Sequence, residues 1–395
     1  MSPKRKRLRR LRYLFGGLTV AVLLLIVFYQ PILFGLTEFV VQQVARSQKF
    51  TIRFKIHGSV FSNLLIQDLH LEPLPANHTL PIESLDVRRF AARYSLLSLL
   101  QQKPSEVVRL IELKDVNLVI RPTPPGPAPS PQPARAAPLR VSPIIPQRID
   151  FSNINIRIRR AEGDLVVRNF GINLTANRPG SLTCSEFALP PVADWKDLKA
   201  GLAIEENVLR LTGLSLPPFL AIDRLTLDAS RISTGRLVGS VSAKTFDAPL
   251  RIDASLDSQA TQTLLVATVQ IARLDLKPFQ QFTNLPITGS IPTLDLSING
   301  DLDHPRSLNG QAVLVGEKIR YQEKQLDDFD LRVSVAEGKG TIDRCLLNAG
   351  LNLVSVSGNF LLPAHSNASI DELVAHIGIA AALLEPARFL PTLQS

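Results

Sequence analysis

The sequence holds little of what most enzymes use at their active sites. It has one tryptophan, four tyrosines and two cysteines in 395 residues. It contains no glycine-rich phosphate loop ending in lysine, no HExxH, no CxxC pair and no GxSxG elbow. Its six histidines are scattered and have no Cys or carboxylate at the spacing of metal ligands. We therefore expect a protein that is not an enzyme, with no catalytic residues, no cofactor and no metal site.

Positive charge is concentrated at one end of the chain. The formal net charge is +9, but residues 1–12 hold seven of the 44 lysines and arginines and no acidic residue. Beyond them 37 basic residues face 35 acidic ones. No basic patch with interleaved aromatics follows, so nucleic acid is not an expected partner. The high pI of the chain instead indicates membrane topology.

A long uncharged run follows the basic residues, and we predict that residues 13–36 form a transmembrane anchor. The 23 residues from Leu14 to Leu36 carry no formal charge, and as a helix they span roughly 30 Å. Basic residues beside such a helix stay cytosolic, so the N-terminus is cytoplasmic and the body lies across the membrane. The alternative is a cleavable signal peptide, but no small-x-small cleavage site follows. The predicted anchor residues are Leu14, Val22, Leu24, Ile26, Phe28 and Leu36.

Residues 37–121 are predicted to form a module of strands and short helices. A helix continues from Thr37 to Lys49, and alternating strands follow over 54–74, 81–93 and 107–121, with a register shift near Asp68. Ser95 caps a short helix over 95–100. Residues 122–146 then hold ten prolines in 25 positions, which cannot pair in a sheet and are predicted to form an extended linker or loop.

Short alternating strands dominate residues 147–395, which predicts an all-β body with few helices. The strands are expected at 148–159, 164–174, 208–216, 222–229, 250–256, 264–276, 293–299, 311–314, 331–335, 342–347 and 351–360. A capping box at Ser369 and Glu372 allows a helix near the end as an alternative.

Two internal repeats are present. Residues 111–121 match residues 149–159 at a constant offset of 38, and residues 267–278 resemble residues 375–386 at an offset of 108. The first copy of the longer repeat is followed by another strand, whereas the chain ends shortly after the second. The sequence is therefore either a fragment of a longer repeat protein or one whose last repeat is truncated in place.

Three groups of residues could suggest chemistry and have a simpler interpretation. Asp301-x-Asp303-His304 resembles a metal or acid–base site, but we interpret it as a polar turn before Pro305. Asp327, Asp328 and Asp330 are interpreted as a solvated strand entry. Cys184 and Cys345 could pair in an oxidising compartment, although buried free thiols are the favoured interpretation.

The spacing of glycines and apolar residues resembles the AsmA-like superfamily, most closely its TamB-type members. Over 54–121 the matching pieces are Gly58-Ser59-x-x-Ser62-x-Leu64, Asp68-Leu69-x-Leu71, Tyr94-Ser95-Leu96-Leu97-x-Leu99-Leu100 and Asp115-Val116-x-Leu118. Ile145-Pro146-Gln147-Arg148-Ile149 follows the proline-rich interruption, and residues 286–361 carry a looser repeat with Gly289, Gly300, Gly310 and Gly358-Asn359-Phe360. Members of this type are usually much longer and end in a distinctive C-terminal domain, which this sequence does not show.

The resemblance implies a single-pass protein of the bacterial inner membrane whose body lies in the periplasm. Its fold would be an elongated, curled antiparallel or mixed β-sheet that forms a taco-like groove, with a few short helices. The resemblance implies phospholipid transport between the inner and outer membranes, with acyl chains as ligand. It also implies an alternative role in assembling outer-membrane β-barrels or autotransporters with a TamA-type partner.

The apolar positions of the alternating strands are the candidates for lining such a groove. Aliphatic side chains that no second sheet covers could be covered by acyl chains. Alternation alone does not decide which face of each strand points inward, and an inert structural spacer remains a third hypothesis. The candidate groove residues are Ile154, Ile156, Ile158, Leu225, Leu227, Ile252, Val269, Ile271, Leu294, Leu296, Val333 and Val335.

Overall fold

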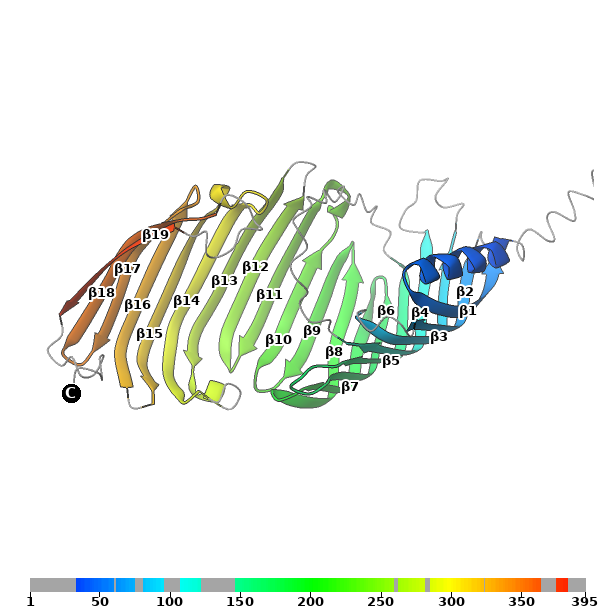
Figure 1. The fold of residues 1–395 in the computed structure, drawn as a ribbon, viewed down its shortest axis with the longest axis horizontal. Coiled ribbons are helices and arrows are strands. Elements are labelled where there is room, and N and C mark those ends of the chain that lie inside the picture. The colour runs from blue at the N-terminus through cyan, green and yellow to red at the C-terminus, as the bar shows by residue number, and fades with distance from the viewer. Residues whose placement is uncertain are drawn as a thin grey trace, which may run out of the picture. The chain divides into compact units, whose positions relative to one another are not determined.

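The chain folds mainly into β-strands, as the sequence predicts. The structure is a computed structural model that describes residues 33–59, 62–74, 81–95, 107–121, 146–258, 262–280, 285–322, 324–363 and 374–382. These residues form 19 strands, labelled in Figure 1. They divide into two compact units, and the division falls inside β6 (Leu165–Thr175), after Phe170.

The first unit contains a mixed sheet in which each strand pairs with the next. β1 to β4 are antiparallel neighbours, and β4 and β5 are parallel. The predicted strands over 81–93 and 107–121 are thus confirmed as β3 and β4. The bounds are β1 (Phe50–Ser59), β2 (Asn63–Pro73), β3 (Ile82–Tyr94), β4 (Val108–Ile120) and β5 (Arg148–Ile158).

A helix over residues 33–47 precedes β1 and agrees with the helix predicted to follow the anchor. Of the predicted anchor residues, Leu36 lies in this helix, whereas Leu14, Val22, Leu24, Ile26 and Phe28 lie outside the described residues. Within the described ranges, no helix is both long enough and apolar enough to cross a membrane. The predicted helix over 95–100 beyond Ser95, the proline-rich residues 122–145 and the capping box at Ser369 also lie outside the described residues.

The 38-residue repeat becomes a pair of neighbouring parallel strands. Ile111 pairs with Ile149, and the pairing between β4 and β5 keeps the same offset up to Ile120 and Ile158. Equivalent residues of the two copies therefore lie side by side on the same face of the sheet. Parallel neighbours need a long crossover connection, and the proline-rich residues join these two strands.

Aspartate and asparagine adopt a left-handed backbone conformation on neighbouring strands of the first sheet. Asp68, Asp115 and Asn153 have φ of 52°, 53° and 54°, a conformation that these two residue types adopt more readily than most. The Asn153 amide donates a hydrogen bond to Asp115 Oδ1 at 2.6 Å, so the left-handed residues of β4 and β5 adjoin. The register shift predicted near Asp68 is confirmed, because the pairing of β1 with β2 shifts there. A bulge of this kind strengthens the local twist of a sheet.

The second unit contains an antiparallel sheet in which consecutive strands from β7 to β19 pair, as Figure 1 shows. Its strands are β7 (Arg178–Leu189), β8 (Ala193–Glu205), β9 (Val208–Leu216), β10 (Leu220–Asp228), β11 (Arg236–Thr245), β12 (Ala248–Ser258), β13 (Thr263–Asp275), β14 (Ile287–Asp301), β15 (Asn309–Tyr321), β16 (Lys324–Ala336), β17 (Lys339–Ala349), β18 (Asn352–Leu361) and β19 (Val374–Ala382). Short 3₁₀ turns lie at η2 (Ile232–Thr234), η3 (Lys277–Phe279) and η4 (Pro305–Ser307).

Three strands of this sheet were not predicted. β7 contains Pro179 and Gly180, and β11 is rich in glycine and serine, so both carry a weak strand pattern. In β8 the left-handed residue Asp197 changes the phase of burial between Trp195 and the residues after it, while the register with β7 stays unchanged. The two copies of the 108-residue repeat form β13 and β19, and β19 pairs with β18.

Buried side chains are few and gather in small clusters. In the first unit Val87, Val116 and Ile154 form a core on neighbouring strands. In the second unit Phe246, Ala248 and Leu274 form another. A series of stacked or edge-on rings ends at this cluster, with successive centroids 4.3–5.6 Å apart: Phe187, Trp195, Phe219, Phe246 and Phe279. The Trp195 indole N–H donates to the Pro217 carbonyl at 2.7 Å, which fixes its ring in the series.

The left-handed residue Asn153 allows a test of the backbone conformation. N153A and N153G both lose the hydrogen bond to Asp115, but only alanine crowds the left-handed backbone, at a cost of about 1–2 kcal/mol. Glycine loses about 0.4–1 kcal/mol through the entropy of its unfolded chain. We expect N153A to be the less stable variant by about 0.5–1 kcal/mol, measured by urea unfolding followed by circular dichroism. Higher stability of N153A would contradict the left-handed assignment.

Candidate functional site

The second unit presents one continuous apolar face, built from three parallel rows of side chains. The strands pair so that small or apolar residues stand opposite one another from strand to strand. The central row runs from β9 to β17 through Leu211, Leu225, Val241, Ile252, Val269, Leu296, Ala312, Val333 and Ile342. Nine strands at a spacing of about 4.8 Å give this row a length on the order of 40 Å.

Two flanking rows extend the apolar face on either side of the central row. From β10 to β17, one holds Leu227, Gly239, Ala254, Ala267, Ile298, Gly310, Val335 and Gly340. The other holds Ile222, Ala243, Leu250, Ile271, Leu294, Leu314, Leu331 and Cys345. None of the three rows contains a charged residue.

The opposite face of the same strands is polar. Residues next to the central row along each strand point to the other side because side chains alternate. They pair as Thr212, Arg224, Ser242, Arg251, Gln270 and Asp295 from β9 to β14. On β16 and β17, Asp330 accepts ion pairs from Arg332 at 3.1 Å and Arg344 at 2.8 Å. The sheet therefore has a charged face and an aliphatic face.

The apolar face is only half-buried. From Leu211 to Ile342 no side chain of the central row is buried, and Leu296 is 43% exposed. In a closed sandwich a second sheet would bury such residues. None of the described elements forms such a layer over the face. No described part of the protein covers these aliphatic side chains.

All nine groove candidates in the second unit lie on this one face. Five belong to the central row: Leu225, Ile252, Val269, Leu296 and Val333. Leu227 and Val335 stand in one flanking row, and Ile271 and Leu294 in the other. The prediction omitted residues such as Leu211 and Val241. The pattern within a single strand does not show that these residues share the row. Only the pairing register between strands shows it.

The three candidates in the first unit occupy a different setting. Ile154 is 7% exposed and packs with Val87 and Val116 in the core cluster, so a ligand could reach little of it. Ile156 is half-buried against the same cluster, and Ile158 pairs with Ile120 at the end of the strand. All three candidates pair with apolar residues of β4. They belong to the surface of the first unit and not to the apolar face of the second.

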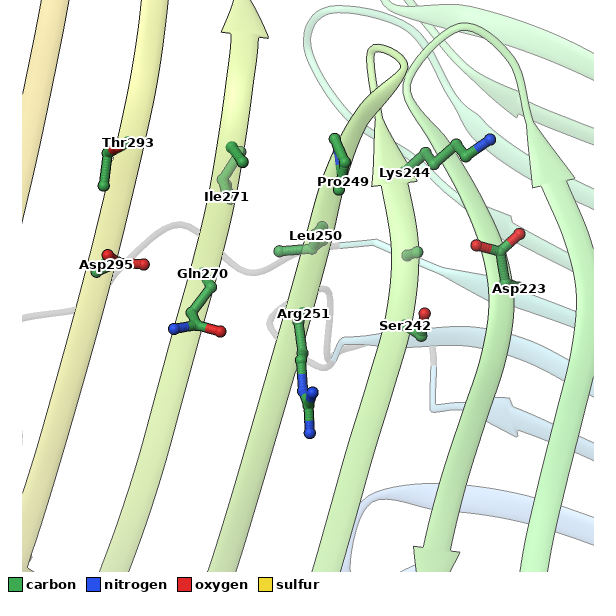
Figure 2. A pocket seen from close by; sticks show the side chains of 12 residues that line it. Asp223, Ser242, Lys244, Pro249, Leu250, Arg251, Gln270, Ile271, Thr293 and Asp295 are labelled. Carbon is green, nitrogen blue, oxygen red and sulfur yellow. The ribbon is translucent and has the colours of Figure 1, made fainter.

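A polar hollow of about 460 Å³ lies over strands β10 to β14 of the second unit. Figure 2 shows its side chains spread over neighbouring strands, with Lys244 and Arg251 extending away from one another. Arg251 is engaged along its own strand, where its Nε donates to Asp253 Oδ2 at 2.7 Å. The labelled groups do not converge on one point, so the hollow offers no arrangement of nucleophile and base.

The Asp301 motif is a polar turn. Asp301 Oδ1 accepts hydrogen bonds from the backbone N–H groups of Thr263 and Asp303, both at 3.0 Å, and Oδ2 lies 2.7 Å from His304 Nδ1. Burial pushes the pKa of Asp301 up, but the hydrogen bonds from His304, Asp303 and Thr263 outweigh it and hold the pKa below its usual value. The carboxylate joins the end of β14 to the start of β13.

The other titratable groups also have structural partners. Asp327 accepts hydrogen bonds from the Gly350 N–H at 2.6 Å and from Gln325 at 2.7 Å. The acidic run predicted as a strand entry lies inside β16, which begins at Lys324. Neither Cys184 nor Cys345 forms a disulfide, and the Cys184 thiol donates to the Glu186 carbonyl at 3.2 Å. Among the described residues, no group of three or more His, Cys, Asp or Glu side chains is placed to hold a metal ion.

One titratable cluster was not anticipated from the sequence. On the first unit, His70 Nδ1 contacts Asp86 on the neighbouring strand, and Nε2 lies 3.0 Å from Glu72. The hydrogen bond to Asp86 is the largest influence and raises the pKa of His70 above 6.5. Because His70 and Asp86 are paired across strands, only the register of β2 and β3 reveals this contact.

The turn at Asp301 has a pH-dependent stability that can be tested. Because the native pKa is lowered, its contribution is fully present above about 3.8 and is lost as the pH falls through the native pKa. D301A leaves two backbone donors without this acceptor and is expected to cost about 1–3 kcal/mol near neutral pH. D301N should lose less and should flatten the acid dependence, measured by urea unfolding at several pH values. D303N, at the exposed neighbour, is the control; an equal loss there would contradict this role for Asp301.

Comparison of the chain with protein-family models, curated proteins and solved structures finds no match. The two faces of the sheet are the features of the second unit that bear on function. One face carries charged side chains, and the other exposes three rows of aliphatic and small side chains.

Proposed function

We propose that the apolar face of the second unit binds phospholipid acyl chains and carries them between two membranes. The observation that supports this is the unbroken pairing of uncharged residues across nine strands, with no described layer covering them. A surface of this kind suits a ligand that is long, apolar and without hydrogen-bonding groups along its length. A hydrocarbon chain has these properties.

The free energy of moving a lipid through water explains why such a face would be useful. Each methylene group kept from water is worth about 0.8 kcal/mol, so a two-tailed lipid meets a barrier of tens of kcal/mol if it crosses unaided. A row of similar aliphatic side chains presents nearly the same environment at every strand. A tail could then move from one strand to the next without passing through water, while its headgroup stays solvated.

The N-terminal sequence supports a membrane at one end of this path. Seven basic residues precede an uncharged run of 23 residues, the arrangement expected for an anchor with a cytoplasmic N-terminus. In this proposal the protein is a single-pass inner-membrane protein, and its sheet lies in the periplasm. The bilayer and phospholipid tails are its principal partners.

A charge placed on the apolar face tests the proposal. V269D puts a carboxylate in the central row, and T268D puts one on the polar face of the same strand. A charge in hydrocarbon costs about 2.5–3.5 kcal/mol, so V269D should lower photo-crosslinking of an acyl-diazirine phospholipid to the second unit by about tenfold or more. T268D should leave it unchanged. Circular dichroism of both variants checks that the sheet still forms.

Crosslinking that survives V269D at the wild-type level would reject the acyl-chain path. If lipid transport in cells also continued, the sheet would be a structural spacer. Crosslinking that falls equally in T268D would show a general loss of structure and would remove the evidence for a specific face.

A second candidate function is assistance to the assembly of outer-membrane β-barrel or autotransporter proteins, with a TamA-type partner. One observation favours it: β19 pairs with β18, and Figure 1 shows no described strand on its other side. Its residues from Ala375 to Ala382 are all exposed, and Ile379 is 71% exposed. An exposed strand edge can add a strand from another chain.

Lysine on this edge tests the second candidate. The 108-residue repeat equates β19 with β13, and β13 pairs antiparallel with β14. A labelled peptide of residues 287–301 should therefore bind the full-length protein, and A380K should weaken its binding by about tenfold or more because edge lysines discourage strand addition. S355K, on the neighbouring β18, is the matched control. Fluorescence anisotropy measures both. Equal binding by wild type and A380K would exclude the β19 edge.

A further inference from the structure

A second apolar site lies in the first unit, between the helix over residues 33–47 and the first strands. It is a cavity of about 300 Å³ whose lining comes from the helix, β1, β2 and Tyr94. Nine of its eleven lining residues are aliphatic or phenylalanine, and none is charged. The other two are Thr37 and Tyr94.

The hydroxyl groups of this cavity already have partners within the protein. Thr37 donates to the Leu33 carbonyl at 2.8 Å, and Tyr94 donates to the Ser59 carbonyl at 3.3 Å. Burial raises the pKa of the Tyr94 hydroxyl, which keeps it neutral. The cavity thus offers apolar contact and no charged group for a ligand headgroup.

The walls of the cavity are held by strand pairing. Ile56 stands opposite Ile66 in the register of β1 and β2, and both side chains line the cavity. Phe54, at the register shift between these strands, is 7% exposed and closes the wall. The floor is therefore part of the sheet, and the helix with Leu33, Phe34 and Val41 is its cover.

The outer side of the same helix is also apolar. Leu36, Phe39, Val40 and Val44 are 49–65% exposed and follow one another at helical spacing. The helix thus carries one apolar stripe toward the cavity and another toward its surroundings. A helix with this distribution is stable in contact with hydrocarbon on both sides.

The last residues of the uncharged run contribute to the lining of this cavity. Leu33 and Phe34 line the cavity and are also the end of the uncharged run from Leu14 to Leu36. Whatever surrounds the end of that run therefore adjoins the cavity. If the run lies in a bilayer, the hydrocarbon of one leaflet continues along the helix to the cavity wall.

We propose that this cavity is an entry site that takes the end of one phospholipid acyl chain from the bilayer leaflet beside the helix. The inference rests on the proposed function, because it places the uncharged run in the membrane. A volume of about 300 Å³ has room for on the order of ten methylene groups, each taken as the size of a water molecule. The cavity therefore suits part of one tail, and the headgroup stays outside it.

The test uses the full-length protein in vesicles that contain a phospholipid with a diazirine at the end of one acyl chain. Wild-type protein should give crosslinks to peptides of β1 and β2, identified by mass spectrometry. V41F fills the cavity from the helix, and L64F fills it from β2. Each should lower the β1–β2 crosslinks by about tenfold or more, whereas V40F, on the exposed stripe, should leave them unchanged. A diazirine on the headgroup should not label these strands.

The outcomes separate the entry site from the conduit. Labelling of Phe39 and Val40 without labelling of β1 or β2 would overturn the entry site and show that the helix only rests against lipid. Undiminished β1–β2 labelling in both V41F and L64F would also overturn it. The proposed conduit would stand in either case if V269D still removed labelling from the second unit. Loss of that V269D effect, with the β1–β2 labelling intact, would instead reject the conduit alone.

Discussion

The register between neighbouring strands is the constraint on which the rest of the structure depends. Side chains alternate along a strand, so a shift of one residue would turn a whole strand over and place its charged residues in the apolar rows. The pairing from Leu211 to Ile342 avoids this on nine successive strands. Where the phase must change, as at Asp343, a bulge absorbs the extra residue, and the next apolar side chain returns to the same face.

A sheet with one uncovered face has to be stabilised mainly within its own plane. Hydrogen bonds join each strand to its neighbours, and side chains of adjacent rows cover part of one another's surface. Full burial is confined to small clusters such as Phe246 with Leu274, and to the ring series that includes Trp195. This division leaves the middle of the apolar face open, and an open aliphatic face is what an acyl-chain ligand requires.

Much of the strand content was predictable because alternation is a local property. β3, β4, β5 and β9 were placed within a few residues, and the interpretation of Asp301 as a polar turn agrees with its three contacts. β8 escaped prediction because the left-handed residue Asp197 interrupts the alternation that identifies a strand. β7 and β11 escaped because proline, glycine and serine weaken the pattern.

The sequence by itself determined most of the strands, where the uncharged run ends, and that the alternating strands have one apolar side. Only the tertiary structure decided that Leu225, Ile252, Val269, Leu296 and Val333 share one row, and that the two copies of the 38-residue repeat lie side by side. It also decided that the helix over 33–47 covers a cavity on β1 and β2. The physical reason is that alternation depends on neighbours along the chain, whereas register depends on hydrogen bonds between strands and on contacts between residues distant in sequence.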